Sequence, residues 1–359
     1  MKRTIYLNGR FLTVPLNGIR RTAFELIKAL DDLLDSGAID KDKYTLEILY
    51  SGEIANPVEL KHIKLTKRGI LKGNLWEQLE LPLYTAGKML INFCTIAPLL
   101  KSNQISVIHD ASVLINPQYF SPAFSKWYNF AVPLINKRAK HVVTVSEFSK
   151  QELHKTLKPA RRDMTVMYNA GEHILDYEKP SQEFIDKVEK HKPYCLSVGS
   201  LAFHKNFQGL SKALKIADIT SHNVLIAGGK LATLETSEAK DNLVYLGYVT
   251  DAELKHLYAN ADLFIFPSLY EGFGIPPLEA MNLGCPVIAS NAASMPEVIA
   301  DAGAYFDPTN VNDMAAKIKG LLNNATRLQE LKQAGYDRAA YFNWHKSAGI
   351  LFNAVAKYV

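Results

Sequence analysis

The chain has 359 residues, of which 48% are hydrophobic and 21% are charged, which is typical of a folded globular protein and argues against a disordered chain. This length favours two domains, and a formal net charge of +5 does not by itself indicate nucleic acid binding. Three cysteines without CxxC spacing argue against a disulfide framework or a zinc site, and no run of about 18 apolar residues predicts a membrane-spanning helix. We therefore expect a cytoplasmic protein.

Short apolar runs alternate with helical stretches in the first half of the chain. The clearest helix is predicted at residues 18–34, where apolar residues recur at helical spacing. The predicted strands are Thr4–Asn8, Thr45–Tyr50, Met89–Phe93, Val107–His109, His141–Val145 and Thr165–Tyr168. Apolar strands separated by helices predict a parallel sheet that is covered on both faces.

A polar stretch that begins after Gly171 and ends near Pro193 is the predicted linker, and the alternation then restarts. A capping box is predicted at Thr250–Glu253. The predicted strands are Tyr194–Val198, Val224–Ala227, Leu243–Leu246, Leu263–Phe266 and Val287–Ala289. We predict an α/β chain with two Rossmann-like, doubly wound domains that face each other across a cleft, at residues 1–175 and 190–340.

Two glutamates follow the strand predicted at Leu263–Phe266, and ligands bind beyond the carboxyl ends of parallel strands. Glu271 lies in the loop, and Glu279 is predicted in the first turn of a helix that begins near two prolines. Gly272 and Gly274 let the backbone approach a ligand, and the helix N-terminus suits phosphate. Each glutamate alone has a plain explanation, as a first-turn acid or a solvated loop acid. Together at one strand end, they favour a binding site.

The segment PSLYEGFGIPPLEAM resembles the two-glutamate motif of glycosyltransferase family 4, and GCPVIASNAASMPEVIADAGAYFDP after it is also similar to that family. The resemblance implies the GT-B fold, with the active site between two Rossmann-like domains and a C-terminal helix at residues 341–359 that crosses back to the first domain. It also implies retaining transfer from a nucleotide sugar. Glu271 then lies near the donor sugar, Glu279 contacts the ribose, and Gly272, Phe273, Gly274 and Ile275 help to bind the donor.

Shorter motifs carry the same resemblance. Gly199-Ser200 followed by Phe203-His204-Lys205-Asn206 is similar to the family's GSxxxRKN segment, with histidine in place of arginine. This implies that Lys205 binds the donor diphosphate beside Gly199 and Ser200, whereas a lone lysine is more often a surface residue.

His109-Asp110 follows a strand and resembles the family's HD pattern, which implies that His109 contacts the transferred sugar. The alternative is a structural histidine. Gly18-Ile19-Arg20-Arg21 resembles the glycine loop GIGRY without its second glycine, which implies that Gly18 approaches donor phosphate or acceptor. Val145–Ser149 matches the family's VSEFS and places Ser146 beside the cleft.

Asp40-Lys41-Asp42 has the DxD spacing of metal-dependent transferases but lies in a polar loop, so we predict a solvated charge run, no metal and no other cofactor. Basic clusters at 61–72, 137–140 and 158–162 predict either contact with the anionic inner-membrane surface or a solvated face. One group of aromatic residues is predicted either to line the acceptor side or to join the core: Trp76, Tyr119, Phe120, Trp127 and Tyr128.

The predicted function is hexosyl transfer from a nucleotide sugar to a glycan or lipid-linked glycan in the synthesis of a bacterial surface polysaccharide such as O-antigen or capsule. Leu75-Trp76-Glu77-Gln78 and Leu81-Pro82 resemble bacterial mannosyl- and rhamnosyltransferases, so GDP-mannose is the leading donor. A GT-B epimerase and a non-catalytic sugar-nucleotide-binding scaffold are the alternatives. A nicotinamide dehydrogenase is disfavoured because no GxGxxG follows a strand.

Overall fold

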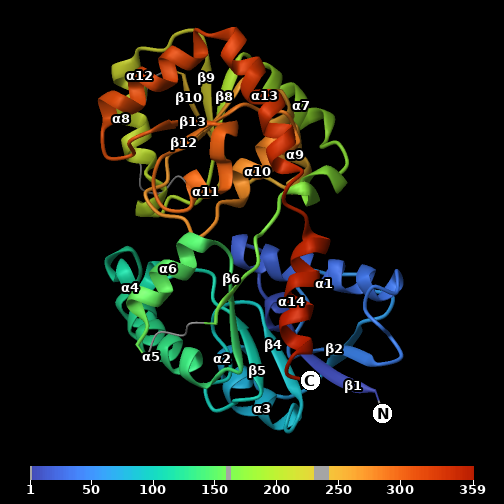
Figure 1. Cartoon of the computed structure of the whole chain (residues 1–359). Helices are drawn as coiled ribbons and strands as arrows, with labels where there is room; N and C mark the ends of the chain where they lie inside the picture. Colours follow the sequence, from blue (N-terminus) through green and yellow to red (C-terminus); the bar gives the residue numbers. More distant parts are fainter. Residues whose placement is uncertain (1, 159–162, 230–241) are drawn as a thin grey trace. The chain divides into compact units, whose positions relative to one another are not determined.

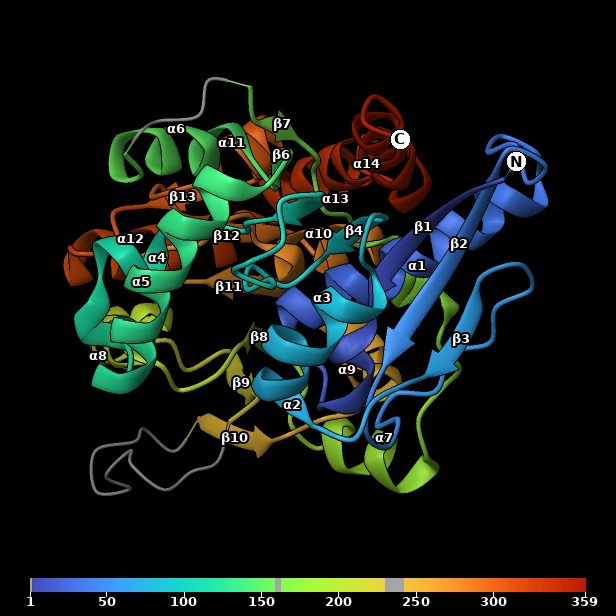
Figure 2. The same ribbon diagram turned by 90° about the horizontal axis from the view of Figure 1, so that it is seen from below.

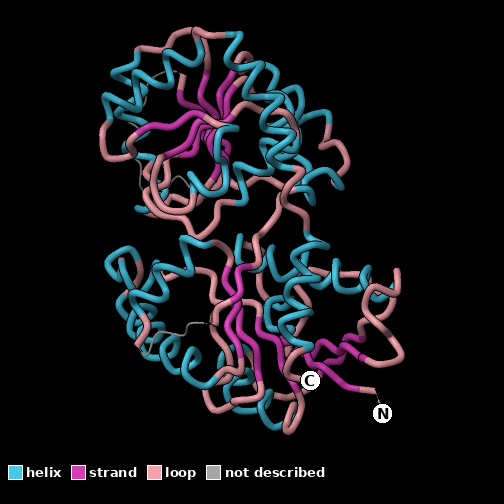
Figure 3. The backbone as a smooth tube through the Cα atoms, viewed as in Figure 1, coloured by secondary structure: helices cyan, strands magenta, loops and turns pink. Residues whose placement is uncertain are grey.

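Parallel strands form a sheet in each of the two units into which the chain divides. The structure is a computed structural model, and it describes residues 2–158, 163–229 and 242–359. Unit 1 comprises Met1–Asn169 and Trp344–Val359, and unit 2 comprises Ala170–Asn343. In Figure 3 the strands lie in the middle of each unit, with helices outside them.

The described residues of unit 1 form a seven-stranded sheet in the order β3-β2-β1-β4-β5-β6-β7, and every pairing is parallel. The chain builds outward from β1 on one side and then on the other, which is the order of a doubly wound sheet. The strands are β1 (Arg3–Asn8), β2 (Tyr44–Tyr50), β3 (Lys64–Lys67), β4 (Met89–Asn92), β5 (Gln104–Val107), β6 (His141–Thr144) and β7 (Thr165–Val166).

Helix α1 (Gly18–Asp35) of unit 1 begins where the Asn17 side chain accepts the N–H of Arg20 at 3.0 Å. Its buried face packs against α14 (Trp344–Ala356), so the end of the chain belongs to unit 1 (Figure 1). The other helices of unit 1 are η1 (Gly9–Thr13), α2 (Gly73–Leu75), η2 (Trp76–Glu80), α3 (Leu81–Tyr84), α4 (Ser112–Ile115), η3 (Pro117–Tyr119), α5 (Pro122–Arg138) and α6 (Glu147–Thr156).

The described residues of unit 2 form a six-stranded parallel sheet in the order β10-β9-β8-β11-β12-β13, which is also doubly wound. Its strands are β8 (Tyr194–Val198), β9 (Asn223–Ala227), β10 (Leu243–Gly247), β11 (Leu263–Phe266), β12 (Val287–Ser290) and β13 (Ala304–Phe306). Both sheets confirm the predicted fold class.

The helices of unit 2 include one that starts at the predicted capping box, where Thr250 and Glu253 exchange hydrogen bonds. The helices are η4 (Glu172–Asp176), α7 (Gln182–Glu189), η5 (Phe203–Lys205), α8 (Phe207–Ala217), α9 (Asp251–Asn260), α10 (Ile275–Asn282), α11 (Met295–Ile299), η7 (Ala300–Ala302), α12 (Val311–Leu322) and α13 (Ala325–Ala339). None of the described helices in either unit is long and apolar enough to span a membrane.

The stretch predicted as a linker is part of unit 2 instead. It contains η4 and α7, and Phe184 and Val188 of α7 are buried. Its high charge hid this short amphipathic helix, because only two of its eight residues reach the core. The chain passes from unit 1 to unit 2 at Asn169–Ala170.

Candidate active site

The strand order reverses once in each sheet, and in doubly wound sheets the ligand crevice lies at this point, beyond the carboxyl ends of the strands. The reversal lies between β8 and β11 in unit 2 and between β1 and β4 in unit 1. Gly199 follows β8, and Glu271 belongs to the loop after β11. In unit 1, Gly9 follows β1 and Phe93 follows β4.

Lys205 and Glu271 form an ion pair in unit 2, with Nζ and Oε1 2.6 Å apart. The two side chains are only 19% and 15% exposed, so water screens the pair less than a surface pair. The Lys205 ammonium also lies 5.6 Å from the centroid of the Phe266 ring. A cation and a carboxylate therefore stand together at the switch point, where an anionic ligand carrying hydroxyl groups can meet both.

Hydrogen bonds from neighbouring segments fix the start of the loop between β11 and α10. Asn206 has left-handed backbone angles (φ 56°), and its side-chain amide donates to the carbonyls of Pro267 (3.2 Å) and Pro308 (2.9 Å). The N–H of Leu269 donates to the carbonyl of His204 at 2.7 Å. The turn that carries Lys205 and the loop that carries Glu271 are therefore fixed relative to each other.

The end of this loop is fixed by Ser294, whose hydroxyl lies 2.9 Å from the carbonyl oxygens of both Glu271 and Phe273. Gly274 has φ 94°, and a Cβ there would lie 2.4 Å from Cε of Met295, so only glycine fits without a rearrangement. The side chains of Phe273 and Ile275 are buried. Both predicted donor-binding residues can therefore meet a ligand only through their backbone.

Close backbone packing surrounds Gly199. Its N–H donates to the Ala227 carbonyl at 3.0 Å. Gly228 has φ 103°, and a Cβ there would lie 2.6 Å from the Gly199 carbonyl oxygen. The glycine at 228 is therefore required by the fold, and it sets the path of the turn that carries Gly199 and Ser200.

Glu279 is the fifth residue of α10, so its predicted place in the first helical turn is wrong. The helix starts at Ile275, because Gly274 with its positive φ takes the N-cap position ahead of the two prolines. Among the described residues no side chain caps this helix terminus, which leaves the positive end of its dipole facing the glycine loop.

The Glu279 carboxylate is buried and anchored by two residues that the sequence did not indicate. The Tyr258 hydroxyl donates to Oε2 at 2.9 Å, and His173 Nε2 lies 3.1 Å from Oε1. Burial, and then the Glu279 charge, raise the pKa of Tyr258 well above its usual value, so its hydroxyl keeps the proton that it donates.

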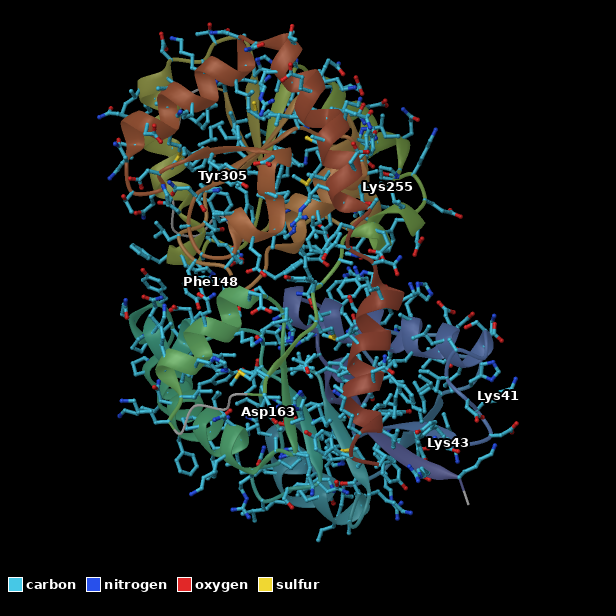
Figure 4. The ribbon with its side chains drawn as sticks, in the orientation of Figure 1. Lys41, Lys43, Phe148, Asp163, Lys255 and Tyr305 are labelled. Atoms are coloured by element: carbon cyan, nitrogen blue, oxygen red, sulfur yellow. The ribbon has the colours of Figure 1, made fainter. Side chains whose placement is uncertain are left out.

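The backbone around this carboxylate is also fixed. A Cβ at Gly171 would lie 2.8 Å from the backbone nitrogen of Glu279, so the chain must pass α10 with a glycine there. Lys255, labelled in Figure 4, donates to the carbonyls of Leu175 (2.7 Å) and Tyr177 (2.6 Å). These contacts hold η4, which carries His173, against α9.

His109 lies two residues beyond β5, which ends at Val107 rather than extending to His109 as predicted. Its ring is buried, and Nε2 lies 2.7 Å from the Phe93 carbonyl oxygen. A carbonyl only accepts, so Nε2 carries the proton and Nδ1 is the acceptor of the neutral ring. Burial lowers the pKa of His109 and favours this neutral form. Asp110 accepts the N–H of Ser112 at 2.7 Å and orders the following turn.

Gly18 is the first residue of α1, and no atom of the residues that the structure describes lies within 4 Å of the position that a Cβ would take. The fold therefore does not require glycine there, which is consistent with a role in ligand approach. Ser146 is buried and caps α6 through Ser149 N at 2.9 Å, so its fold role is helix capping.

A pocket of ≈ 260 Å³ lies in unit 1 at the switch point between β1 and β4. Of the aromatic residues named above, Trp127 and Tyr128 line it together with Phe124, whereas Trp76 is buried in the core beside it. Arg20 of the glycine-loop motif also lines the pocket. An aromatic wall with a few polar groups is typical of small-molecule sites.

The polar side of this pocket is an ion pair between half-buried Arg10 and buried Glu77, which the sequence did not indicate. Arg10 Nη1 lies 2.6 Å from Glu77 Oε2, and the Asn8 amide donates to Glu77 Oε1 at 2.8 Å. Burial raises the pKa of Glu77, while the Arg10 charge opposes this shift. Burial also raises the pKa of the Cys94 thiol to about 12, so this pocket residue is protonated and unreactive as a nucleophile.

The DxD-spaced acids lie at a surface turn. Asp40 Oδ1 accepts the N–H of Asp42 at 2.8 Å and of Lys43 at 3.2 Å, and Figure 4 shows Lys41 and Lys43 pointing outward. Asp40 thus stabilises its own turn. Across the described ranges, no group of three or more His, Cys, Asp or Glu side chains is placed to hold a metal ion.

Two doubly wound sheets, one of which carries a lysine–carboxylate pair ahead of a helix N-terminus at its switch point, suit the binding of an anionic, hydroxylated ligand. Residues 178–338 match the family described as Glycosyl transferases group 1. The chain therefore carries a group 1 glycosyltransferase domain and is a glycosyltransferase of the GT-B fold, which confirms the family resemblance.

Two relatives agree with this assignment, and a solved structure agrees with the fold. The chain is 29% identical over 265 residues to the O-antigen chain mannosyltransferase B of Escherichia coli, covering 70% of this chain and 69% of that protein. It is 33% identical over 233 residues to the O-antigen chain mannosyltransferase RfbU of Salmonella typhimurium, covering 62% of each. The structure of Anabaena HepE in complex with UDP and glucose superposes with a TM-score of 0.72 at 16% identity, covering 99% of this chain and 100% of that one.

Proposed function

We propose that the chain is a retaining glycosyltransferase that moves mannose from GDP-mannose to a growing glycan or lipid-linked glycan in bacterial surface polysaccharide synthesis. The observation that carries this proposal is the Lys205–Glu271 pair at the switch point of unit 2. The sugar and the pathway are supported by the two O-antigen chain mannosyltransferases that the chain resembles.

Lys205 is the proposed partner of the donor diphosphate. In the structure its charge is balanced by Glu271, and a diphosphate would offer it a partner of higher charge. As the bond from the anomeric carbon to the phosphate oxygen breaks, negative charge grows on the leaving group. Lys205 and the α10 N-terminus would stabilise this charge most strongly in the transition state. We expect them to do so without a divalent ion.

Glu271, released from Lys205, would accept hydrogen bonds from the hydroxyl groups of the donor sugar. The backbone of Gly272, Phe273, Gly274 and Ile275 would offer N–H groups beside it, and the turn at Gly199 and Ser200 would face the diphosphate. An acceptor hydroxyl then attacks from the face that the diphosphate leaves and passes its proton to the leaving phosphate oxygen, which gives retention.

Glu279 is the proposed ribose contact. Each carboxylate oxygen has two acceptor positions, so bonds to Tyr258 and His173 leave room for the two ribose hydroxyl groups. Because these two residues fix the carboxylate before the donor arrives, binding costs little side-chain entropy.

In unit 1, the family resemblance assigns His109 to the transferred sugar and Gly18 to donor phosphate or acceptor. The neutral His109 ring donates from Nε2 to the Phe93 carbonyl, so its Nδ1 would accept a hydrogen bond from a hydroxyl group of the sugar.

The pocket of unit 1 is the proposed acceptor site. Aromatic rings such as Trp127 and Tyr128 can cover the apolar face of a sugar ring, while Arg10, Glu77 and Asn8 offer donors and acceptors for its hydroxyl groups. This division of polar and apolar walls favours a neutral sugar, since the charges of Arg10 and Glu77 already balance.

A lipid-linked acceptor would place the enzyme at the cytoplasmic face of the inner membrane, and we propose peripheral contact there. The basic cluster at residues 61–72 supports such contact, as does that at 137–140. In the third cluster, residues 159–162 lie outside the described residues.

The test is transfer by the purified chain from GDP-, UDP- and dTDP-sugars to a glycan acceptor, with NMR of the product to give its anomeric configuration. We expect acceptor-dependent release of GDP from GDP-mannose, an α-linked product and no activity in Glu271→Ala. Turnover without an acceptor, or full activity of Glu271→Ala, would contradict the proposal.

A further inference from the structure

A row of leucines faces solvent on the helical segment formed by α2, η2 and α3, residues 73–84. Leu75, Leu79 and Leu83 are 61%, 56% and 73% exposed, and Ile70 just before the segment is 89% exposed. Scattered exposed apolar residues are common, but a row at four-residue intervals on one helix marks a contact surface. We name these four residues the leucine stripe; α2 and α3 lie next to each other in Figures 1 and 2.

The exposure of Ile70 is built into the local structure. Glu80 Oε2 accepts the N–H groups of both Ile70 and Leu71 at 3.1 Å. The Trp76 indole donates to the Arg68 carbonyl at 2.7 Å, and the Arg68 guanidinium lies 4.5 Å from the centroid of the Tyr84 ring. These contacts fix the loop against the helical segment, so the backbone of Ile70 is held in place with its side chain in solvent.

The opposite face of the same segment already has its partners. Trp76 and Leu81 are buried in a cluster with Leu49 and Leu90, and Asn74 and Glu77 line the unit 1 pocket. The leucine stripe is therefore not part of the core. It lies on the solvent-facing side of the helical segment that lines the proposed acceptor pocket.

Between residues 64 and 88, which flank and include the stripe, every exposed charged side chain is basic. Lys64, Lys67, Lys72 and Lys88 are exposed. The two acids of the segment are already engaged, Glu77 with Arg10 and Glu80 with the loop backbone. An apolar row flanked by lysines suits an anionic lipid surface. A second copy of the chain would bring like charges together and is disfavoured.

We propose that the leucine stripe docks unit 1 onto an anionic membrane surface, with Leu75, Leu79, Leu83 and Ile70 entering the headgroup region and the flanking lysines meeting lipid phosphates. The proposed pocket, lined by Asn74, then lies beside the headgroups. In linking this surface to a lipid-linked acceptor, the inference rests on the proposed function; the docking itself does not.

Flotation of the full chain with vesicles of phosphatidylethanolamine and phosphatidylglycerol tests the docking. Wild type should bind these vesicles and not vesicles of phosphatidylcholine alone. The triple variant Leu75→Gln, Leu79→Gln, Leu83→Gln keeps good helix formers and should weaken binding by roughly tenfold for each leucine. Lys67→Gln with Lys72→Gln should weaken it by about fivefold per charge, and salt should do the same.

The matched control replaces three exposed apolar residues of unit 2: Leu175→Gln, Ile216→Gln, Tyr248→Gln. It should bind vesicles as wild type does. Unchanged binding by the stripe variant, or no binding by wild type, would overturn the proposal. So would a dimer, seen by analytical ultracentrifugation, that only the stripe variant loses.

Transfer to a water-soluble acceptor separates this outcome from the proposed function. The stripe variant should keep its rate with that acceptor and lose rate only with an acceptor embedded in vesicles. A wild type that binds vesicles but transfers nothing would contradict the proposed function and leave the docking intact.

Discussion

Replacing Lys205 with methionine removes one half of the Lys205–Glu271 pair and leaves the carboxylate, only 15% exposed, without its 2.6 Å partner. An exposed pair would contribute little, and a fully buried one would cost about 3–5 kcal/mol to break. The intermediate burial places the expected loss at about 1–2 kcal/mol of unfolding free energy. Lys205→Met combined with Glu271→Gln should recover most of it, since no charge is then left unpaired.

Transfer should respond differently from stability. If Lys205 stabilises the leaving diphosphate, Lys205→Met should lower kcat/KM about 100- to 1,000-fold, as does the loss of one preorganised donor to a developing anion. The double variant should remain as inactive as the single variants, although its stability recovers. This split between stability and activity distinguishes a site residue from a residue that only holds the loop.

Urea unfolding followed by circular dichroism gives the stability, and GDP release from GDP-mannose gives kcat/KM. Arg327→Met is the matched control, because Arg327 and Glu330 form a 2.8 Å pair between two exposed side chains of α13. It should change stability by less than about 1 kcal/mol and leave activity unchanged. If Lys205→Met keeps kcat/KM within a few-fold of wild type, the diphosphate assignment is refuted.

Three further predictions each concern the surroundings of one or two residues. Gly228→Ala should lower the free energy of unfolding by about 1–3 kcal/mol, because φ is 103° and the new Cβ would lie 2.6 Å from the Gly199 carbonyl oxygen. Gly18→Ala should instead unfold at the wild-type temperature and lose sugar transfer. Thermal unfolding of both variants, together with an assay of transfer, checks this pair. Tyr258→Phe removes the 2.9 Å hydrogen bond to Glu279 and should raise KM for the donor several-fold with little change in kcat, so equal KM values in steady-state kinetics would count against it. Burial lowers the pKa of His109 from 6.5, so as the pH falls the unfolded chain takes up a proton there before the folded chain does. The free energy of unfolding should therefore fall as the pH drops below about 6.5. Unfolding experiments between about pH 5 and 7.5 should show a shallower loss of stability in His109→Gln.

The frame of the fold was accessible from the sequence because buried parallel strands are short, continuous apolar runs. β8 and β11 were predicted at their observed ends, and they are the strands that carry the site. β3 was missed because Lys64–Lys67 is an edge strand with two lysines among its four residues, and β13 because three residues are too short a pattern.

The site itself was only partly accessible. Lys205 and Glu271 were each predicted to bind donor, but a contact across 66 positions cannot be deduced from spacing. The same limit applies to His173 and Tyr258, which reach Glu279 from η4 and α9. The leucine stripe was hidden because Leu75, Leu79 and Leu83 have the spacing of an ordinary core-facing helix, and only the structure shows that they point outward.

The most direct test of the central claim is a crystal structure of the full chain with a bound nucleoside diphosphate. The account predicts the diphosphate at the carboxyl ends of β8 and β11, with Lys205 Nζ about 2.8 Å from a phosphate oxygen and Glu271 released from the lysine. A diphosphate bound elsewhere, with the 2.6 Å Lys205–Glu271 pair intact, would contradict it.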